Sequence, residues 1–304
     1  MKKVLGIGNA LVDVLVQVES ELILNELQLP KGSMQLINTE RYLKIQKRLE
    51  SLNKQLTTGG SACNTILAIA NLGGQPGLIG KVGHDEMATF FADNCVRHDI
   101  KANLLHAEQL PTGVASTFIT PDGQRTFGTH LGAAATLTAD DIKAEWFEGY
   151  DYFYIEGYLV QNHALIRRAV DLAHRAGLQV CIDLASFNIV EEDREFFKEL
   201  LQKTDIVFAN ELEAAAFTGC TDAQHNVEAL AKLCHIAVVK HWQEGRSCAP
   251  WRRTDSLSGT RGACGGRHHS SGRLFLGRLF ICPFSGLRPD GMCPFGFLAL
   301  RTHH

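Results

Sequence analysis

Residues 57–74 constrain the fold more than any other stretch, because two adjacent glycines run directly into an apolar helical pattern. The stretch reads TTGGSACNTILAIANLGG. Its apolar residues between 66 and 72 recur at helical spacing, which predicts a helix with one face toward a core. Ser61 is placed to cap the first turn of this helix, and Gly73 to end it. The glycine turn is therefore expected to be fixed in position.

The same turn carries groups that suit a ligand rich in hydroxyls. Gly59 and Gly60 have no Cβ, so a ligand can lie against their backbone. Asn64, one turn into the helix, offers both a donor and an acceptor to hydroxyl groups. A purely structural turn before a core helix is the alternative that these residues alone leave open.

Strands and helices alternate regularly between residues 151 and 240. Such alternation predicts an α/β fold, with a parallel sheet covered by helices on both faces. The expected strands are 3–7, 78–82, 151–156, 178–183, 205–209 and 236–240, and the expected helices include 162–176 and 191–202. Ligands of such sheets bind at the carboxyl ends of the strands, where Asn9, Asp183 and Asn210 fall.

Other strand-like runs do not belong to this alternation. Residues 11–18 partly alternate apolar and polar side chains, and residues 34–37 form a short run after the Pro30-Lys31-Gly32 turn. Residues 111–130 form two β-rich runs around Asp122-Gly123, which is a hairpin signal. These runs predict β structure outside the main sheet.

Three motifs together carry a family resemblance. GNALVD, residues 8–13, follows the first expected strand, the glycine turn comes next, and FANELEAAAFTG, residues 208–219, follows a later strand. In this order and at these separations they resemble the PfkB (ribokinase-like) family of small-molecule kinases, from residue 1 to about residue 240. Residues 19–46 resemble the adenosine kinase branch.

The resemblance implies a three-layer α/β/α sandwich with a small β-sheet lid, built from segments of about 11–46 and 104–131. It also implies that a hydroxyl of a nucleoside or sugar attacks the γ-phosphorus of ATP. Asp13 would accept hydrogen bonds from two adjacent ribose hydroxyls, because a carboxylate offers two acceptor oxygens. The other implied substrate-binding residues are Asn9, Gly59, Gly60, Ser61 and Asn64.

The resemblance implies a phosphate site as well. Arg125, just after the hairpin turn, would reach from the lid toward the phosphates, because guanidinium geometry suits phosphate oxygens. Asn210 and Glu213 would hold Mg²⁺ and ATP through water and the nucleotide phosphates, with Glu211 as a further candidate. The structural alternatives are a solvated hairpin charge for Arg125 and a helix cap for Asn210.

The character of the sequence changes after Lys240. Residues 241–304 contain no lysine but nine arginines, and they hold ten of the 28 glycines. The catalytic base of the family is the aspartate of a G-A-G-D type motif, and no such motif is present. Asp255 and Asp290 are the only later aspartates, and neither follows a glycine-rich turn that opens a helix. We therefore expect a kinase domain in residues 1–240 and an aberrant tail in residues 241–304.

A change of reading frame near codon 240 explains this tail. With a free choice of third codon positions, a shift of one nucleotide lets HWQEGR read T-G-R-K-G and lets GRHHSSGRL read V-D-T-T-A-A-G-D. Both are the motifs that the family places next. Either a biological mutation or a sequencing error would produce such a tail, and residual activity stays open.

Composition narrows the partners and the compartment. A net charge of −3 gives no electrostatic footprint for nucleic acid or a membrane surface, so a small molecule is the expected partner. No apolar run reaches the roughly 18 to 20 residues that span a bilayer. Nine cysteines without paired spacing indicate reduced thiols and a cytoplasmic location. Monomer and homodimer both stay open.

Rival functions leave weaker traces. Gly6-Ile7-Gly8 lacks the third glycine of a dinucleotide fingerprint and precedes a strand-like pattern. The cysteines and histidines of residues 248–293 lack the paired spacing of a zinc site. Two alternatives stay in view: a sugar kinase of the ribokinase or fructokinase type, and a non-catalytic remnant that binds nucleoside without phosphorylating it.

Overall fold

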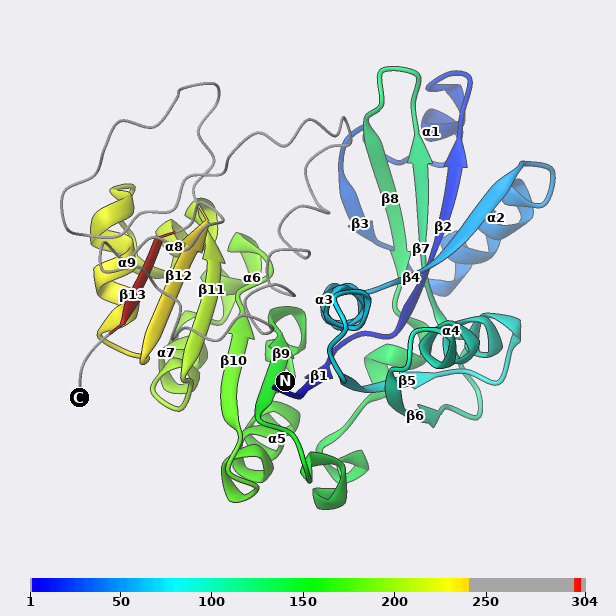
Figure 1. Ribbon diagram of the computed structural model, residues 1–304. Coiled ribbons are helices and arrows are strands. Elements are labelled where there is room, and N and C mark those ends of the chain that lie inside the picture. Colours follow the sequence, from blue (N-terminus) through cyan, green and yellow to red (C-terminus); the bar gives the residue numbers. More distant parts are fainter. Residues whose placement is uncertain (1, 241–297, 302–304) are drawn as a thin grey trace.

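The computed structural model describes residues 2–240 and 298–301, which form two sheets (Figure 1). The large sheet has eight strands in the order β13-β12-β11-β10-β9-β1-β5-β6, and every neighbouring pair is parallel except β12 with β13. Its strands are β1 (Val4–Ile7), β5 (Gly77–Val82), β6 (Lys101–His106), β9 (Tyr152–Glu156), β10 (Gln179–Asp183), β11 (Ile206–Asn210), β12 (Ile236–Lys240) and β13 (Leu298–Arg301).

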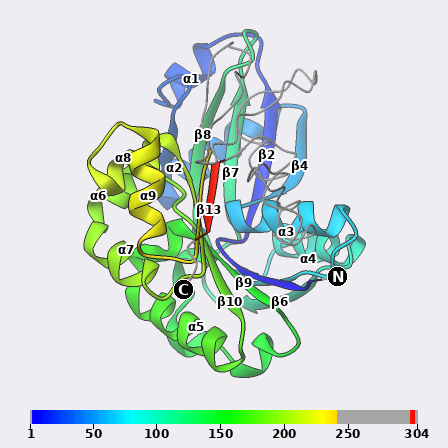
Figure 2. The ribbon, with the colours of Figure 1, turned by 60° about the vertical axis from the view of Figure 1, so that its left-hand side comes forward.

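Helices cover both faces of the large sheet because its strands are apolar on both sides. Figure 2 shows the sheet with α5 to α9 on one side and α3 and α4 on the other. Side chains of β1, β9, β10 and β11 alternate between the two resulting cores. The covering helices are α3 (Ser61–Asn71), α4 (Glu86–Arg97), α5 (His163–Arg175), α6 (Phe187–Glu192), α7 (Arg194–Leu201), α8 (Glu211–Thr218) and α9 (Ala223–Ala231). The expected α/β/α sandwich is confirmed.

The single helix expected at 191–202 is wrong in detail. The structure has α6 and α7 instead, separated at Asp193. Asp193 has φ −116° and ψ 30°, and one of its carboxylate oxygens lies 2.9 Å from Nε2 of His163 on α5. An aspartate whose side chain is engaged elsewhere is a poor residue for a helix interior, which explains the break.

The smaller sheet, which we call the lid sheet, has the order β3-β8-β7-β2-β4. Helices α1 (Leu22–Glu26) and α2 (Thr39–Leu49) pack their apolar side chains against one of its faces. Its strands are β2 (Leu11–Gln17), β3 (Met34–Leu36), β4 (Lys54–Gly59), β7 (Gly113–Ile119) and β8 (Arg125–His130). The sequence reading missed β4, whose residues KQLTTG are mostly polar and partly exposed. That strand leads directly into the glycine turn.

Four residues of the segment expected to be an aberrant tail belong to the large sheet. Leu298–Arg301 forms β13, which pairs antiparallel with β12, with Ala299 opposite Val238. The strand extends the sheet by one edge position. The remaining proposals for the tail, including the zinc candidates, Asp255 and Asp290, lie outside the described residues.

Candidate functional site

The glycine turn lies at the junction of the lid sheet and the large sheet. β4 ends at Gly59 and α3 begins at Ser61, so Gly60 is the N-cap, with φ 90° and ψ 138°. A Cβ on Gly60 would collide with the carbonyl oxygen of Asn9, and a Cβ on Gly59 would collide with the carboxylate of Asp13. The two glycines therefore allow both predicted ligand residues to approach the turn.

The predicted capping role of Ser61 is wrong. Ser61 is the first residue of the helix. The N-cap residue is Gly60, which has no side chain that could cap the helix. The next amide, that of Ala62, donates instead to Oε2 of Glu156 at 2.9 Å. A distant strand therefore supplies the cap, and its negative charge also suits the positive end of the helix dipole.

Glu156 is the site residue that sequence reasoning missed. It ends β9, is only 2% exposed, and accepts a hydrogen bond from Nδ2 of Asn9 at 2.7 Å through Oε1. One buried carboxylate therefore joins Asn9 to the start of α3. The signal was a glutamate that ends the apolar run YFYIE, because β9 lies beside β1 and the carboxyl ends of parallel strands share one edge.

Asp13 and Asn64 lie on either side of this junction. Asp13 is in the middle of β2, opposite Thr57 of β4 and Ala115 of β7, and it is half-buried. Asn64 is in the first turn of α3, where its backbone N–H donates to the carbonyl oxygen of Gly60 at 3.0 Å. The structure thus gathers the substrate-binding candidates Asn9, Asp13, Gly59, Gly60, Ser61 and Asn64 around one turn.

Arg125 is not part of this group. It begins β8 opposite Ile119 of β7 and is exposed, whereas Asp13 lies opposite Ala115. Four strand residues separate the two positions, which is about 13 Å along the lid sheet. Both side chains project from the same face, because positions an even number apart share a face of a sheet. Arg125 is therefore at the outer end of the lid.

Asn210 and Glu213 form a capping box at the start of α8. Oδ1 of Asn210 accepts from the amide of Glu213 at 2.9 Å. The Glu213 carboxylate accepts from the amide of Asn210 at 2.8 Å and from its Nδ2 at 2.6 Å. The helix cap that was the structural alternative for Asn210 is therefore present. It does not exclude a role in binding, because carboxylate and amide oxygens have further lone pairs.

The electrostatics around Glu213 fit a cation. Burial, together with the negative charge of Asp183 on β10, raises the pKa of Glu213 to about 8, against the opposing effects of the backbone hydrogen bond from Asn210 and the charge of Lys240. A divalent cation near both carboxylates would remove this repulsion. Among the described residues no three acidic, histidine or cysteine side chains form a metal cluster. Mg²⁺ would therefore need water and phosphate oxygens as its other ligands, as it commonly does.

The two candidate groups lie along the same edge of the large sheet. Asn9 follows β1 and lies against the glycine turn, and Asn210 ends β11, three strands away through β9 and β10. At about 4.8 Å per strand this separation is roughly 14 Å. The edge therefore has room for a small acceptor at one end and a phosphate chain at the other.

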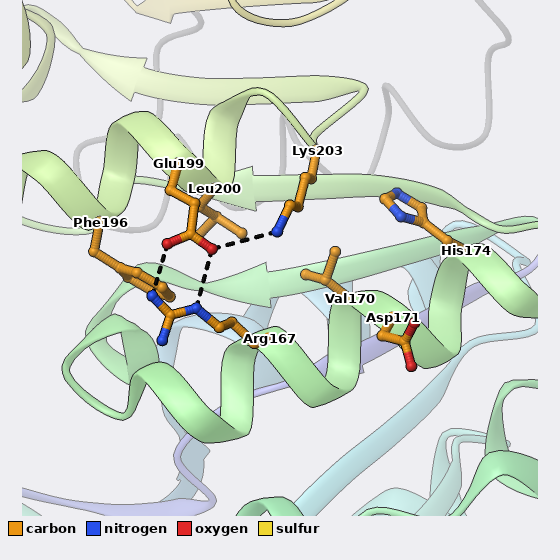
Figure 3. Close-up of a pocket in the computed structure, with 8 residues that line it drawn as sticks. All are labelled: Arg167, Val170, Asp171, His174, Phe196, Glu199, Leu200 and Lys203. Atoms are coloured by element: carbon orange, nitrogen blue, oxygen red, sulfur yellow. Dashed lines mark hydrogen bonds and ion pairs between the residues drawn. The ribbon is translucent and has the colours of Figure 1, made fainter.

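A pocket between α5 and α7 lies elsewhere in the fold (Figure 3). Arg167 donates to the two carboxylate oxygens of Glu199 at 3.0 and 2.7 Å, and Lys203 donates to the same carboxylate at 3.3 Å. The Arg167 guanidinium lowers the pKa of Glu199 to about 2. None of the predicted site residues lines this pocket. It is a surface ion-pair cluster, separate from the candidate site.

The layers, the lid sheet and the strand-end position of the site define a ribokinase-like α/β protein. Comparison with known proteins agrees: residues 34–244 match the pfkB family of carbohydrate kinases. The chain belongs to this family.

Solved structures give the same answer. The adenosine kinase of Sinorhizobium meliloti superposes with a TM-score of 0.74 at 28% identity, over 92% of this chain and 86% of that one. A probable sugar kinase of Rhizobium etli CFN 42 superposes with a TM-score of 0.70 at 30% identity, over 79% of this chain and 74% of that one. Likeness to both a nucleoside kinase and a sugar kinase leaves the acceptor undecided at the level of the fold.

Comparison with a relative shows how much of the length of a kinase of this family the chain matches. The aminoimidazole riboside kinase of Salmonella typhimurium is 26% identical over 62% of this chain, but the match covers only 56% of the relative. The chain therefore spans little more than half the length of that relative. Among the described residues, no helix is both long and apolar enough to cross a membrane.

Proposed function

We propose that this fold serves the transfer of the ATP γ-phosphate, with Mg²⁺, to a hydroxymethyl group of an adenosine-like nucleoside. We further propose that the chain as written binds the nucleoside but phosphorylates it poorly. The observation that carries the proposal is the packing of Asn9 and Asp13 against Gly59 and Gly60, where the lid sheet meets the large sheet.

The acceptor site suits a ribosyl group. The Asp13 carboxylate offers two oxygens to two neighbouring hydroxyls, and Asn64 offers a further donor and acceptor one helical turn from the glycines. Glu156 holds Asn9 at 2.7 Å and the Ala62 amide at 2.9 Å. These bonds hold Asn9 and the start of α3 in place before any ligand binds, so this part of the site is preorganised.

The lid sheet favours a nucleoside over a free sugar. Met34 of β3 lies opposite Phe127 of β8, and Phe127 lies opposite Thr117, two residues from the partner of Asp13. Met34, Leu36 and Phe127 therefore share the lid face that carries Asp13. Met34 is 48% exposed and Leu36 62% exposed. A flat apolar base gains from contact with such side chains, whereas a free sugar offers mainly hydroxyls.

The phosphate end of the site is proposed at Asn210, Glu213 and Arg125. When bound, Mg²⁺ would neutralise charge on the phosphates, and Asp183 and Glu213 supply the carboxylates for it. Arg125 starts roughly 16 Å from Asp13, four residues along the strands and two strands across the lid sheet. We therefore propose that the lid must move toward the large sheet before Arg125 can touch a phosphate, a kind of closure that many enzymes use.

The missing base motif limits the reaction. Loss of a general base costs about 10² to 10⁴ in rate, and loss of an oxyanion-type donor about 10² to 10³. The chain as written has neither the G-A-G-D type aspartate nor its glycine-rich turn. Removal or insertion of one nucleotide near codon 240 should restore both. We also propose a cytoplasmic location, supported by the thiols of Cys63, Cys95, Cys181 and Cys220, which form no disulfide among the described residues.

Calorimetry and a product assay test the proposal together. The full chain is titrated with adenosine, ribose and fructose, and ADP formation is measured for this chain and for a frame-corrected one. We expect adenosine to bind most tightly and only the corrected chain to turn over. Tighter binding of ribose or fructose would replace the nucleoside with a sugar. Equal turnover by both chains would overturn the role of the missing motif.

A further inference from the structure

The chain passes several times between the lid sheet and the large sheet, and one carboxylate outside the candidate site binds the segment that leads into β7. Asp85 precedes α4, and its Oδ1 accepts from the amide of Ala88 at 2.8 Å as an ordinary helix cap. The same side chain also binds Thr112, the residue directly before β7. A helix cap alone does not need this second partner.

Three short hydrogen bonds connect these residues. Oδ2 of Asp85 accepts from the amide of Thr112 at 2.7 Å, and Oδ1 accepts from Oγ1 of Thr112 at 2.6 Å. Oγ1 of Thr112 in turn accepts from the amide of Gly83 at 2.9 Å. Thr112 is fully buried. Hydrogen bonds to a carboxylate are stronger than neutral ones, so these bonds tie the β5–α4 loop to the residue before β7.

The neighbouring crossings depend on the same place. The chain leaves β8 after His130, and the amide of Ala133 donates to the carbonyl oxygen of Pro111 at 2.8 Å. Further along α4, Nδ2 of Asn94 donates to Oγ1 of Thr58 at 2.9 Å, one residue before Gly59. Helix α4 and its N-cap residue therefore contact the end of β4 and the segment before β7. The segment after β8 is hydrogen-bonded to Pro111, the residue before Thr112.

The geometry points to Asp85 as a positioning residue that sets the angle of the lid sheet over the candidate site. β7 lies between β2, which carries Asp13, and β8, which carries Arg125. No predicted ligand contact involves Asp85. Its effect on the site passes through Thr112 and the strand that follows.

The strand register converts a change at Thr112 into a displacement at the site. Ala115, opposite Asp13, is three residues beyond Thr112, and Ile119, opposite Arg125, is seven residues beyond it. At about 3.3 Å per residue, a tilt of about 5° at Thr112 moves Asp13 by about 1 Å and Arg125 by about 2 Å. Misplacement by about 1 Å can cost about 10²-fold in a reaction that depends on alignment.

Asp85→Asn separates this role from helix capping. Asparagine caps a helix about as well as aspartate, so the bond from Ala88 can be kept. The second oxygen becomes an NH₂ group that faces the amide of Thr112, and a buried donor is left unpaired. Asp222→Asn is the matched control, because Asp222 caps α9 through the amide of His225 at 2.7 Å, and α9 packs against α8 and β12 of the large-sheet layer.

Hydrogen exchange of the full chain without ligand is the measurement. We expect Asp85→Asn to speed exchange about tenfold in β7 and β8, with β9 unchanged and no effect of Asp222→Asn on the lid. Thr112→Val, which removes only the hydroxyl bonds, should give a smaller effect with the same pattern. Wild-type exchange in β7 and β8, or acceleration confined to α4, would overturn the assignment.

Adenosine titration then measures the consequence for the site, and only this part rests on the function proposed above. We expect Asp85→Asn to weaken adenosine binding about tenfold, and Asp222→Asn to leave it unchanged. If the wild-type chain binds no adenosine, the proposed function fails while the exchange result stands. A loosened lid with undiminished adenosine affinity would refute the positioning role.

Discussion

Replacement of Gly60 by alanine should destabilise the protein far more than the same replacement at Gly73, at the other end of α3. Both glycines have positive φ, 90° at Gly60 and 85° at Gly73. Both substitutions also remove the same freedom from the unfolded chain, so that contribution cancels between them. The comparison therefore reports the backbone strain at each glycine together with what the new Cβ meets in the folded protein.

The structure gives the difference between the two sites. A Cβ at Gly73 has no heavy atom within 4 Å, so only the backbone strain remains, about 1 to 2 kcal/mol. A Cβ at Gly60 collides with the carbonyl oxygen of Asn9, which is backbone and cannot rotate away. Movement of Asn9 would also disturb its buried bond to Glu156, worth about 1 to 3 kcal/mol. We therefore expect Gly60→Ala to cost at least about 2 kcal/mol more than Gly73→Ala, a factor of roughly 30 in the folding equilibrium.

Urea unfolding followed by far-ultraviolet circular dichroism measures both variants against the wild type. Equal slopes against urea concentration show that the unfolded states are comparable, so the midpoints report stability. Adenosine titration should show lost binding for Gly60→Ala and retained binding for Gly73→Ala. If the two variants have the same stability, the close approach of Asn9 to the glycine turn is not a constraint, and the argument for this turn fails.

Three further predictions concern single carboxylates. Asp13→Ala should weaken adenosine binding by at least about tenfold while ATP binding holds, since the loss of hydrogen bonds to a charged group costs about 1.5 to 3 kcal/mol each; titration with each ligand decides. Glu156→Gln should destabilise the chain by about 1 to 3 kcal/mol in urea unfolding, because the new NH₂ group leaves the Ala62 amide unpaired, and wild-type stability would contradict this. For Glu213, the folded pKa of about 8 lies above the ordinary value of 4.5, so its contribution to stability is complete below about pH 4.5 and is lost as the pH rises to about 8. Between pH 5 and pH 8 the wild type should lose up to about 1.4 kcal/mol per pH unit relative to Glu213→Gln, and parallel pH curves would refute the shift.

Local sequence patterns determined most of the elements. The apolar runs at 151–156 and 236–240 predicted β9 and β12, and the helix expected from residue 162 is α5, which Asn162 caps. These features depend on neighbouring residues only, which is why they can be read without a structure. The strand-end rule likewise placed Asn9 and Asn210 at one edge of the sheet.

Tertiary structure decided what these residues touch. The cap of α3 comes from Glu156, 94 residues away in the chain from Ala62. The β4 strand forms because it pairs with β2, since the residues KQLTTG do not favour a strand by themselves. Arg125 resembles a phosphate ligand in sequence, yet the register of β8 sets it at the far end of the lid sheet from Asp13.

The division has one physical reason. A motif fixes the chemistry that a residue can perform, because side-chain type and local backbone conformation are properties of the sequence. Position relative to another segment depends on how strands order themselves and on which buried polar groups must be paired. GNALVD and the glycine turn therefore specified a hydroxyl-binding site, whereas Glu156 and Asp85, which hold its walls and its lid in place, emerged only from the packing of distant strands.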